Sequence, residues 1–208
     1  VLRQSSEFLT ETLNEQQRKN MKRSRPKILL ATNLDDAMAM YEKYKSNLLG
    51  VISDVGFCEH RGGKPEEEKL DAGLNLVRHI KADDPKMPIL LQSSQDSICP
   101  VAEELGVGFL RKYSKTLMIQ LYDYIKEEFA FGDFIFRDAD RVEYGRAANL
   151  KELEVLMREI PEDILLANTS KNMLSKWFMA RGLFTLGARL KKVTESHFAN
   201  VAELRAYV

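Results

Sequence analysis

Short apolar segments alternate with amphipathic helical segments through the first two thirds of the chain, and this alternation strongly limits the folds open to it. Strands joined through helices run parallel and are covered by helices on both faces. The pattern therefore predicts an α/β fold with a parallel sheet and flanking helices. The expected strands are 27–33, 49–55, 87–93 and 108–112, and the expected helices are 35–45, 72–82, 99–106 and 115–129. Asn33 is placed to cap the first of these helices.

The segment before the first expected strand has a helical pattern. Leu2, Phe8 or Leu9, Leu13 and Met21 recur at helical spacing among charged and amide residues of 2–22. We predict one amphipathic helix that is more exposed than buried, ended by a proline at position 26. The chain begins inside this helix without an initiator methionine, so we expect it to be part of a larger protein.

The last third of the chain has a different pattern. Alternating apolar residues in 133–147 predict a hairpin, and Asn149 is placed to cap a helix that Pro161 ends. Residues 170–192 predict one long helix, in which the stripe around Trp177 is more typical of a core than of a cofactor site. The predicted organisation is an N-terminal helix (1–25), an α/β domain (26–131) and a small, mainly helical C-terminal subdomain (132–208).

The charge and cysteine content exclude several classes of protein. Lys plus Arg and Asp plus Glu both number 31, so the formal net charge is zero, which offers no electrostatic footprint for nucleic acid or an anionic membrane. No apolar run approaches the roughly 20 residues of a membrane span, and no signal sequence is visible. Cys58 and Cys99 show no pairing pattern, which indicates a reducing compartment and a cytoplasmic location.

Three polar residues fall at the carboxyl ends of expected strands. They are Asp54, Ser93 and Lys112. In an open α/β sheet the functional crevice lies beyond these ends. A carboxylate that acquires a new anionic charge can pair with an ammonium and accept a hydrogen bond from a hydroxyl. The alternative is a structural Asp–Lys ion pair with a hydroxyl nearby.

The segments that carry these residues resemble one family. GVISDVGF, DAGLNLVRHIKADDPKMPILLQSS and ELGVGFLRKYSKTL are similar to the receiver domains of response regulators. The resemblance implies a flavodoxin-like fold, no enzyme activity in the chain itself, and a sensor histidine kinase or phosphotransfer protein as partner. It also implies that Asp54 is the phosphoacceptor and that Ser93 and Lys112 contact the phosphate. Asp54 and the carbonyl of Gly56 would bind Mg²⁺.

The chain departs from this family in its metal-binding residues. Taking 27–33 as the first strand would put Thr32 and Asn33 where receivers carry an acidic pair, and neither replaces a carboxylate. Only 21 residues separate Asn33 from Asp54, about half the separation found in receivers. On this spacing 27–33 matches the second strand of the family, and the first strand with its acidic pair would precede Val1. Tyr113 stands where receivers usually have proline.

A narrower resemblance covers nearly the whole chain. RPKILLATN, GVISDVGF, LLQSS, FGDFIFRD and the tail from RAANLKELE onward are similar to the regulatory segment of large bacterial phosphoenolpyruvate synthase-like proteins. It implies that an ATP- and pyruvate-binding catalytic module follows Val208. A sheet without its central strand would pair 27–33 directly with 49–55, or would borrow a strand from another molecule in a homodimer. Both arrangements stay open.

Two functions from different classes follow from these residues. In the first, Asp54 accepts a phosphoryl group in a two-component or phosphorelay pathway, and Ser93 and Lys112 respond to it. In the second, the chain is a pseudo-receiver that acts in interaction or dimerisation and passes no phosphate. The missing acidic pair favours the second for this chain, because the transferring phosphoryl charge would be poorly compensated without metal. We therefore expect no phosphate uptake from acetyl phosphate and Mg²⁺.

The remaining candidate ligands do not make a site by sequence. Cys58 and His60 flank Glu59, but two ligands without a second pair are not a metal site. His79 is expected at the edge of a helix, and His197 lies in a polar terminal segment.

Overall fold

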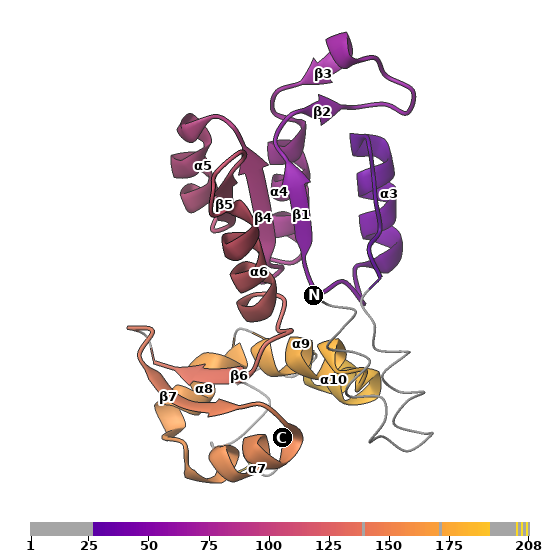
Figure 1. Ribbon diagram of the computed structural model, residues 1–208. Coiled ribbons are helices and arrows are strands. Elements are labelled where there is room, and N and C mark those ends of the chain that lie inside the picture. Colours follow the sequence, from indigo (N-terminus) through magenta and orange to yellow (C-terminus); the bar gives the residue numbers. More distant parts are fainter. Residues whose placement is uncertain are drawn as a thin grey trace, which may run out of the picture.

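A three-stranded parallel sheet forms the centre of the first part of the chain (Figure 1). The computed structural model describes residues 27–138, 140–170 and 172–191, together with Glu203, Arg205 and Tyr207. The elements of this first part are α3 (Leu34–Tyr44), β1 (Val51–Asp54), β2 (Phe57–Cys58), η1 (Pro65–Glu67), β3 (Glu68–Lys69), α4 (Ala72–Asp83), β4 (Ile89–Ser93), η2 (Asp96–Ile98), α5 (Cys99–Glu104), β5 (Gly108–Arg111) and α6 (Leu117–Glu127).

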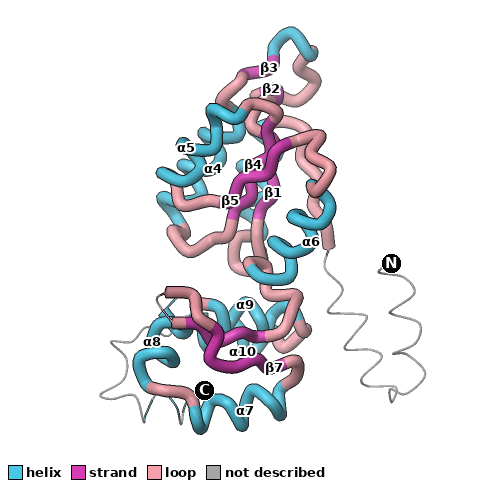
Figure 2. Tube along the Cα trace, turned by 60° about the vertical axis from the view of Figure 1, so that its left-hand side comes forward, coloured by secondary structure: helices cyan, strands magenta, loops and turns pink. Residues whose placement is uncertain are grey.

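The strand order in the parallel sheet is β1-β4-β5, so β4 is the central strand. Ile52 lies beside Leu90, and Leu90 lies beside Gly108, which puts these three residues on one face. Helices α4 and α5 cover the opposite face, and α6 covers the face that carries Leu90 (Figures 1 and 2). The α/β prediction with a parallel sheet and flanking helices is confirmed.

The main core of this part lies between the sheet and α3, α4 and α5. It contains ten buried residues: Tyr41, Val55, Leu74, Leu76, Val77, Ile80, Met87, Ile89, Leu91 and Ala102. Asn33 caps α3 as predicted, because its side-chain oxygen accepts a hydrogen bond from the Asp36 amide at 2.8 Å. The Tyr41 hydroxyl then joins α3 to α4 by donating to Asp83 at 2.8 Å.

The prediction of a strand over 27–33 is wrong. Residues 27–32 form no strand, and the side chains of Ile28 and Leu30 are 92% and 77% exposed. Only Asn33 forms an isolated parallel bridge, to Cys58. Apolar composition favours extended backbone, but a strand exists only where a neighbouring strand accepts its hydrogen bonds.

The second part of the chain has its own hydrophobic core. Its elements are β6 (Phe134–Arg137), β7 (Glu143–Ala147), α7 (Leu150–Glu159), α8 (Glu162–Ser170), α9 (Met173–Ala180) and α10 (Phe184–Lys191). β6 and β7 pair antiparallel, which confirms the predicted hairpin. Asn149 caps α7 by accepting amide hydrogen bonds from Lys151 and Glu152.

The prediction of one long helix over 170–192 is also wrong. The chain leaves helical geometry at Asn172 and again at Gly182, where φ is positive (56° and 78°). The Gly182 amide donates to the Met179 carbonyl, which is typical of a helix C-terminus. The apolar stripe therefore spans two helices, and Trp177 and Phe178 are buried as predicted.

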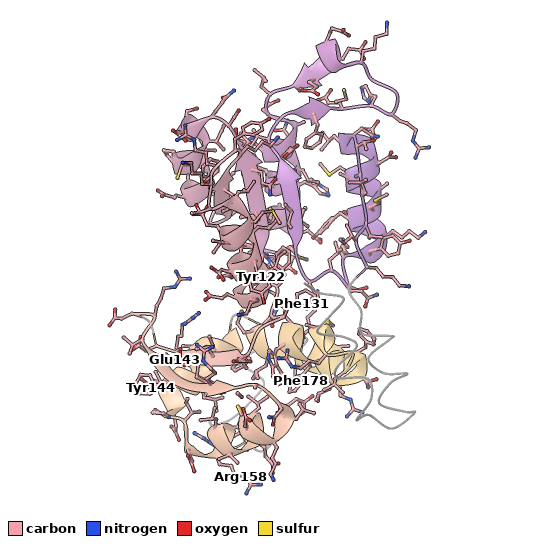
Figure 3. The ribbon with its side chains drawn as sticks, in the orientation of Figure 1. Tyr122, Phe131, Glu143, Tyr144, Arg158 and Phe178 are labelled. Atoms are coloured by element: carbon pink, nitrogen blue, oxygen red, sulfur yellow. The ribbon has the colours of Figure 1, made fainter. Side chains whose placement is uncertain are left out.

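The loop between α4 and β4 joins the two parts. The Lys176 ammonium donates to the Lys86 carbonyl at 2.7 Å, and the Lys191 ammonium lies 3.9 Å from the Asp84 carboxylate. Phe131 lies in the segment between the two parts (Figure 3). The Arg181 guanidinium donates to the carbonyl of Gly132 at 2.8 Å, so α9 also holds the segment that follows α6.

The position of Lys176 predicts a dependence of stability on pH. Burial lowers the pKa of Lys176 to about 8, against the opposing effect of Asp84 and Glu128, while Lys81 and Lys191 lower it further. An unfolded lysine titrates near pH 10.4, so between these values the folded chain binds fewer protons. We expect the free energy of unfolding to rise by about 1–2 kcal/mol from about pH 8 to about pH 10. This is less than the whole pKa difference would give, because solvent partly screens the charge of Lys176.

Denaturant titrations at several pH values of wild type and Lys176→Met check this expectation. The variant should lack the rise, whereas Lys151→Met, which removes an exposed lysine on α7, should retain it. The same pH profile in wild type and Lys176→Met would contradict the assignment.

The predicted helix over 2–22 lies outside the described residues. Among the described residues, no helix has the length and apolar character required to cross a membrane.

Candidate functional site

Asp54 ends β1 at the carboxyl edge of the parallel sheet. Its position depends on α4, because the Gly73 amide donates to the Val55 carbonyl at 2.8 Å. A Cβ atom on Gly73 would lie 2.0 Å from the Asp54 carbonyl oxygen. The absence of a side chain at Gly73 therefore allows the start of α4 to approach the backbone that carries the carboxylate.

Lys112 reaches Asp54 from across the central strand. Its Nζ atom lies 3.0 Å from Asp54 Oδ1, and the two side chains are 32% and 47% exposed. The backbone places Lys112 directly after β5, where its amide donates to the Ser93 carbonyl at 2.8 Å. The structure thus brings together two of the three predicted residues in direct contact.

Ser93 ends the central strand and is 8% exposed. Its hydroxyl oxygen accepts a hydrogen bond from the Gln95 amide at 3.1 Å, which fixes the turn after β4. The hydroxyl hydrogen is free of this bond, so Ser93 can still donate to an anion. Ser93 is joined to Lys112 through the backbone.

An open pocket of about 150 Å³ lies at this edge of the sheet. The residues that line it include Gly56, Ser93 and Lys112, three of the four residues predicted for the site. The fourth, Asp54, pairs through its carboxylate with the lining residue Lys112. The other lining residues are Val55, Leu70, Gln92, Ser94 and Gln95. The pocket therefore offers an ammonium, a hydroxyl and amide groups, a set suited to a small anion.

The described residues do not fit Mg²⁺. They contain no group of three or more histidine, cysteine, aspartate or glutamate side chains able to hold a metal ion. One oxygen of Asp54 already pairs with Lys112. Mg²⁺ keeps several waters and is usually held by one or two carboxylates, so a site here would depend on the Asp54 carboxylate, which Lys112 already engages, and on the Gly56 carbonyl.

The Cys58–His60 segment makes contacts within the β2–β3 hairpin and also contacts α3. Cys58 Sγ donates to the Lys64 carbonyl, Glu59 pairs with Lys69 at 2.8 Å, and His60 Nδ1 lies 2.8 Å from Asp35 Oδ2. The Asp35 carboxylate raises the pKa of His60. These three side chains therefore have separate partners in the structure.

Sequence reasoning missed several residues of the site. Gln92 lies between Asp54 and Leu110 in the sheet register, a position that its place near the end of an expected strand could have indicated. Leu70 reaches the pocket because β2 and β3 form a hairpin, which no sequence pattern signalled. Tyr113, the departure from the family pattern, has a positive φ of 65° and is 90% exposed.

Comparison of the chain with protein-family models, curated proteins and solved structures found no match.

Proposed function

We propose that the chain is a receiver-like regulatory module of the two-component or phosphorelay type, with a flavodoxin-like fold and Asp54 at the phosphoacceptor position. The observation that carries the proposal is the 3.0 Å contact between Lys112 Nζ and Asp54 Oδ1 at the carboxyl edge of the sheet. Ser93, at the end of the strand between them, supports it. This is the arrangement that the sequence resemblance implies for a phosphoacceptor and the groups that respond to it.

In this proposal the site responds to a change of charge. An Asp54 oxygen attacks the phosphorus of a phosphohistidine on a sensor kinase or phosphotransfer protein, a P–O bond forms, and the P–N bond to the donor breaks. The added phosphate carries about two negative charges, which an ammonium and a hydroxyl donor stabilise. Ser93 Oγ accepts from the Gln95 amide while its hydroxyl hydrogen is free to donate to the phosphate, so this side chain would link the new charge to the turn before η2.

The proposed partners depend on the sequence resemblance. They are the phosphate donor, a phosphoenolpyruvate synthase-like module in the same protein, and a second copy of the chain. In this proposal the catalytic step belongs to that module, and the chain described here regulates it.

A second candidate function is a pseudo-receiver that acts in interaction or dimerisation and passes no phosphate. The observation that favours it is the poor fit of the described residues to Mg²⁺. Without a metal the transferring phosphoryl charge is poorly compensated.

Intact-mass measurement after incubation with acetyl phosphate and Mg²⁺ separates the two candidates. The pseudo-receiver predicts no stable gain of a phosphoryl group, because the metal ligands among the described residues are incomplete, whereas the phosphoacceptor proposal predicts a gain of one phosphoryl group. A gain that Asp54→Ala abolishes would contradict the pseudo-receiver and establish Asp54 as the acceptor. A gain that Asp54→Ala retains would place the modification elsewhere.

A second measurement tests the regulatory site without phosphate. Asp54→Asn removes the negative charge that faces Lys112 and keeps the size of the side chain. We expect faster amide hydrogen exchange in residues 93–98 and 112–116, since the ion pair ties the ends of β1 and β5 together. Unchanged exchange in both segments would contradict a regulatory role for the pair. Asp96→Asn, which breaks an exposed pair with Arg111 next to the site, is the matched control.

A further inference from the structure

The α/β part (α3 to α6) and the C-terminal part (β6 to α10) meet through polar and charged groups. Their two hydrophobic cores share no residue, and within the described chain each extensive contact between helices or strands joins elements of the same part. The C-terminal part lies beyond the amino-terminal edge of the parallel sheet, at the end opposite the candidate site (Figures 1 and 2). The groups that cross this boundary therefore decide how firmly the two parts are joined.

Ion pairs join the β6–β7 hairpin to the end of α6. The Arg137 guanidinium on β6 lies 3.5 Å from the Glu127 carboxylate, and the Arg141 guanidinium, in the turn after β6, lies 3.8 Å from the Glu128 carboxylate. The side chains of Glu127 and Arg141 are 48% and 80% exposed, so ions of the solvent reach both pairs. The hairpin supplies both bases, and the end of α6 supplies both acids.

Lysines on α9 and α10 contact the loop between α4 and β4 with the same direction of charge. The Lys191 ammonium lies 3.9 Å from the Asp84 carboxylate, and the Lys176 ammonium donates to the Lys86 carbonyl at 2.7 Å. Asp84 and Glu128 both attract the Lys176 ammonium. The C-terminal part thus presents bases to carboxylates and a carbonyl of the α/β part.

We propose that this boundary is a hinge, held closed by the complementary charges, that opens while both parts stay folded. Contacts between domains of one chain permit relative motion unless they are large and apolar. Exposed ion pairs weaken as salt shortens the Debye length from about 10 Å at 0.1 M to about 3 Å at 1 M. The position of the C-terminal part relative to the sheet therefore depends on ionic strength and on any charge added to either surface.

The turn between α6 and β6 is the pivot of this hinge. The Gly132 amide donates to the Lys126 carbonyl at 2.8 Å, and the Arg181 guanidinium donates to the Gly132 carbonyl at 2.8 Å. This turn is therefore bonded to both parts, and Ala130 within it has a positive φ of 61°. Hinges are a few loop or element-terminal residues of this kind. Rotation at the turn separates the α4–β4 loop from α9 and α10 and leaves both cores intact, because the cores share no residue.

Reversal of charge on the C-terminal part tests the proposal in the full chain. The opening variant is Arg141→Glu with Lys191→Glu, which places like charges opposite the carboxylates of the α/β part. The matched control is Lys151→Glu with Arg158→Glu, which makes the same change of net charge at exposed positions of α7.

Small-angle X-ray scattering of the monomer and amide hydrogen exchange report the state of the hinge. At about 0.1 M salt we expect the opening variant to have a larger radius of gyration than the control, and several-fold faster exchange in residues 84–87. In wild type, about 1 M salt should produce the same two changes. In the opening variant the added salt screens the repulsion, so it should not enlarge the radius further.

Three results would overturn the proposal. Equal radius and exchange in the opening variant and the control would show that charge does not hold the boundary closed, and an unchanged wild type at high salt would show the same. Faster exchange in β4 and α8 together with residues 84–87 would show unfolding of the parts and no hinge. The substitutions lie outside the candidate site, so failure here leaves the proposed function untouched.

Discussion

Trp177→Ala is expected to lower the free energy of unfolding of the C-terminal part by about 3–5 kcal/mol, the usual cost of removing a large buried aromatic side chain. Trp177 is fully buried and its ring makes edge contacts with Phe134 and Phe178. Its Nε1 donates to the Gly132 carbonyl at 3.1 Å, and the Arg181 guanidinium lies 3.6 Å from the ring centroid. The substitution therefore removes core volume and the contact that orients the segment after α6.

Denaturant titration followed by circular dichroism measures the effect, because the variant lacks the single tryptophan that fluorescence would report. Phe184→Ala on α10 is the matched control, since this aromatic side chain is 48% exposed and should cost less than about 1 kcal/mol. Equal losses in the two variants would contradict the role of Trp177 as the centre of this core.

Gly73→Ala is expected to destabilise the α/β part by about 1–3 kcal/mol and to displace Asp54. The new Cβ would lie 2.0 Å from the Asp54 carbonyl oxygen and 2.8 Å from the Val55 Cα. Both are backbone atoms, so relief requires β1 or α4 to move. The higher helix propensity of alanine, worth up to about 1 kcal/mol, opposes this loss but does not remove the clash.

Gly56→Ala is the control for this prediction. Gly56 lies two residues after Asp54 and lines the pocket, but a Cβ there would meet nothing closer than 3.6 Å, so we expect a change in stability within about 0.5 kcal/mol. Denaturant titration gives the stabilities, and the Asp54 amide and side-chain resonances report its displacement by NMR. Equal stability of Gly73→Ala and wild type, with unshifted Asp54 resonances, would contradict the close approach of α4 to β1.

Much of the candidate site could be predicted because its residues follow apolar segments. Asp54, Ser93 and Lys112 all lie at or just after the ends of strands, and the parallel arrangement brings these ends to one edge. The contact between Lys112 and Asp54 was one of two alternatives at the level of the sequence. It depends on the register across β4, and on a lysine long enough to span the central strand.

The sequence by itself determined those features that depend on neighbours along the chain. The caps at Asn33 and Asn149 bond to amides two or three residues away, and the alternation of strands and helices follows from local apolar periodicity. Residues a few positions apart are close whatever the rest of the fold does. Such features were therefore predicted correctly.

Tertiary structure alone decided the features that need a distant partner. Residues 27–32 have the composition of a strand but pair with no strand in the described part of the chain, because hydrogen bonding across a sheet is not a local property. The break at Gly182 follows the packing of α10 against α9, where Ser175 donates to the Gly187 carbonyl at 2.7 Å. The ion pair at Asp54 likewise joins residues that only the order and register of three strands bring within 3.0 Å.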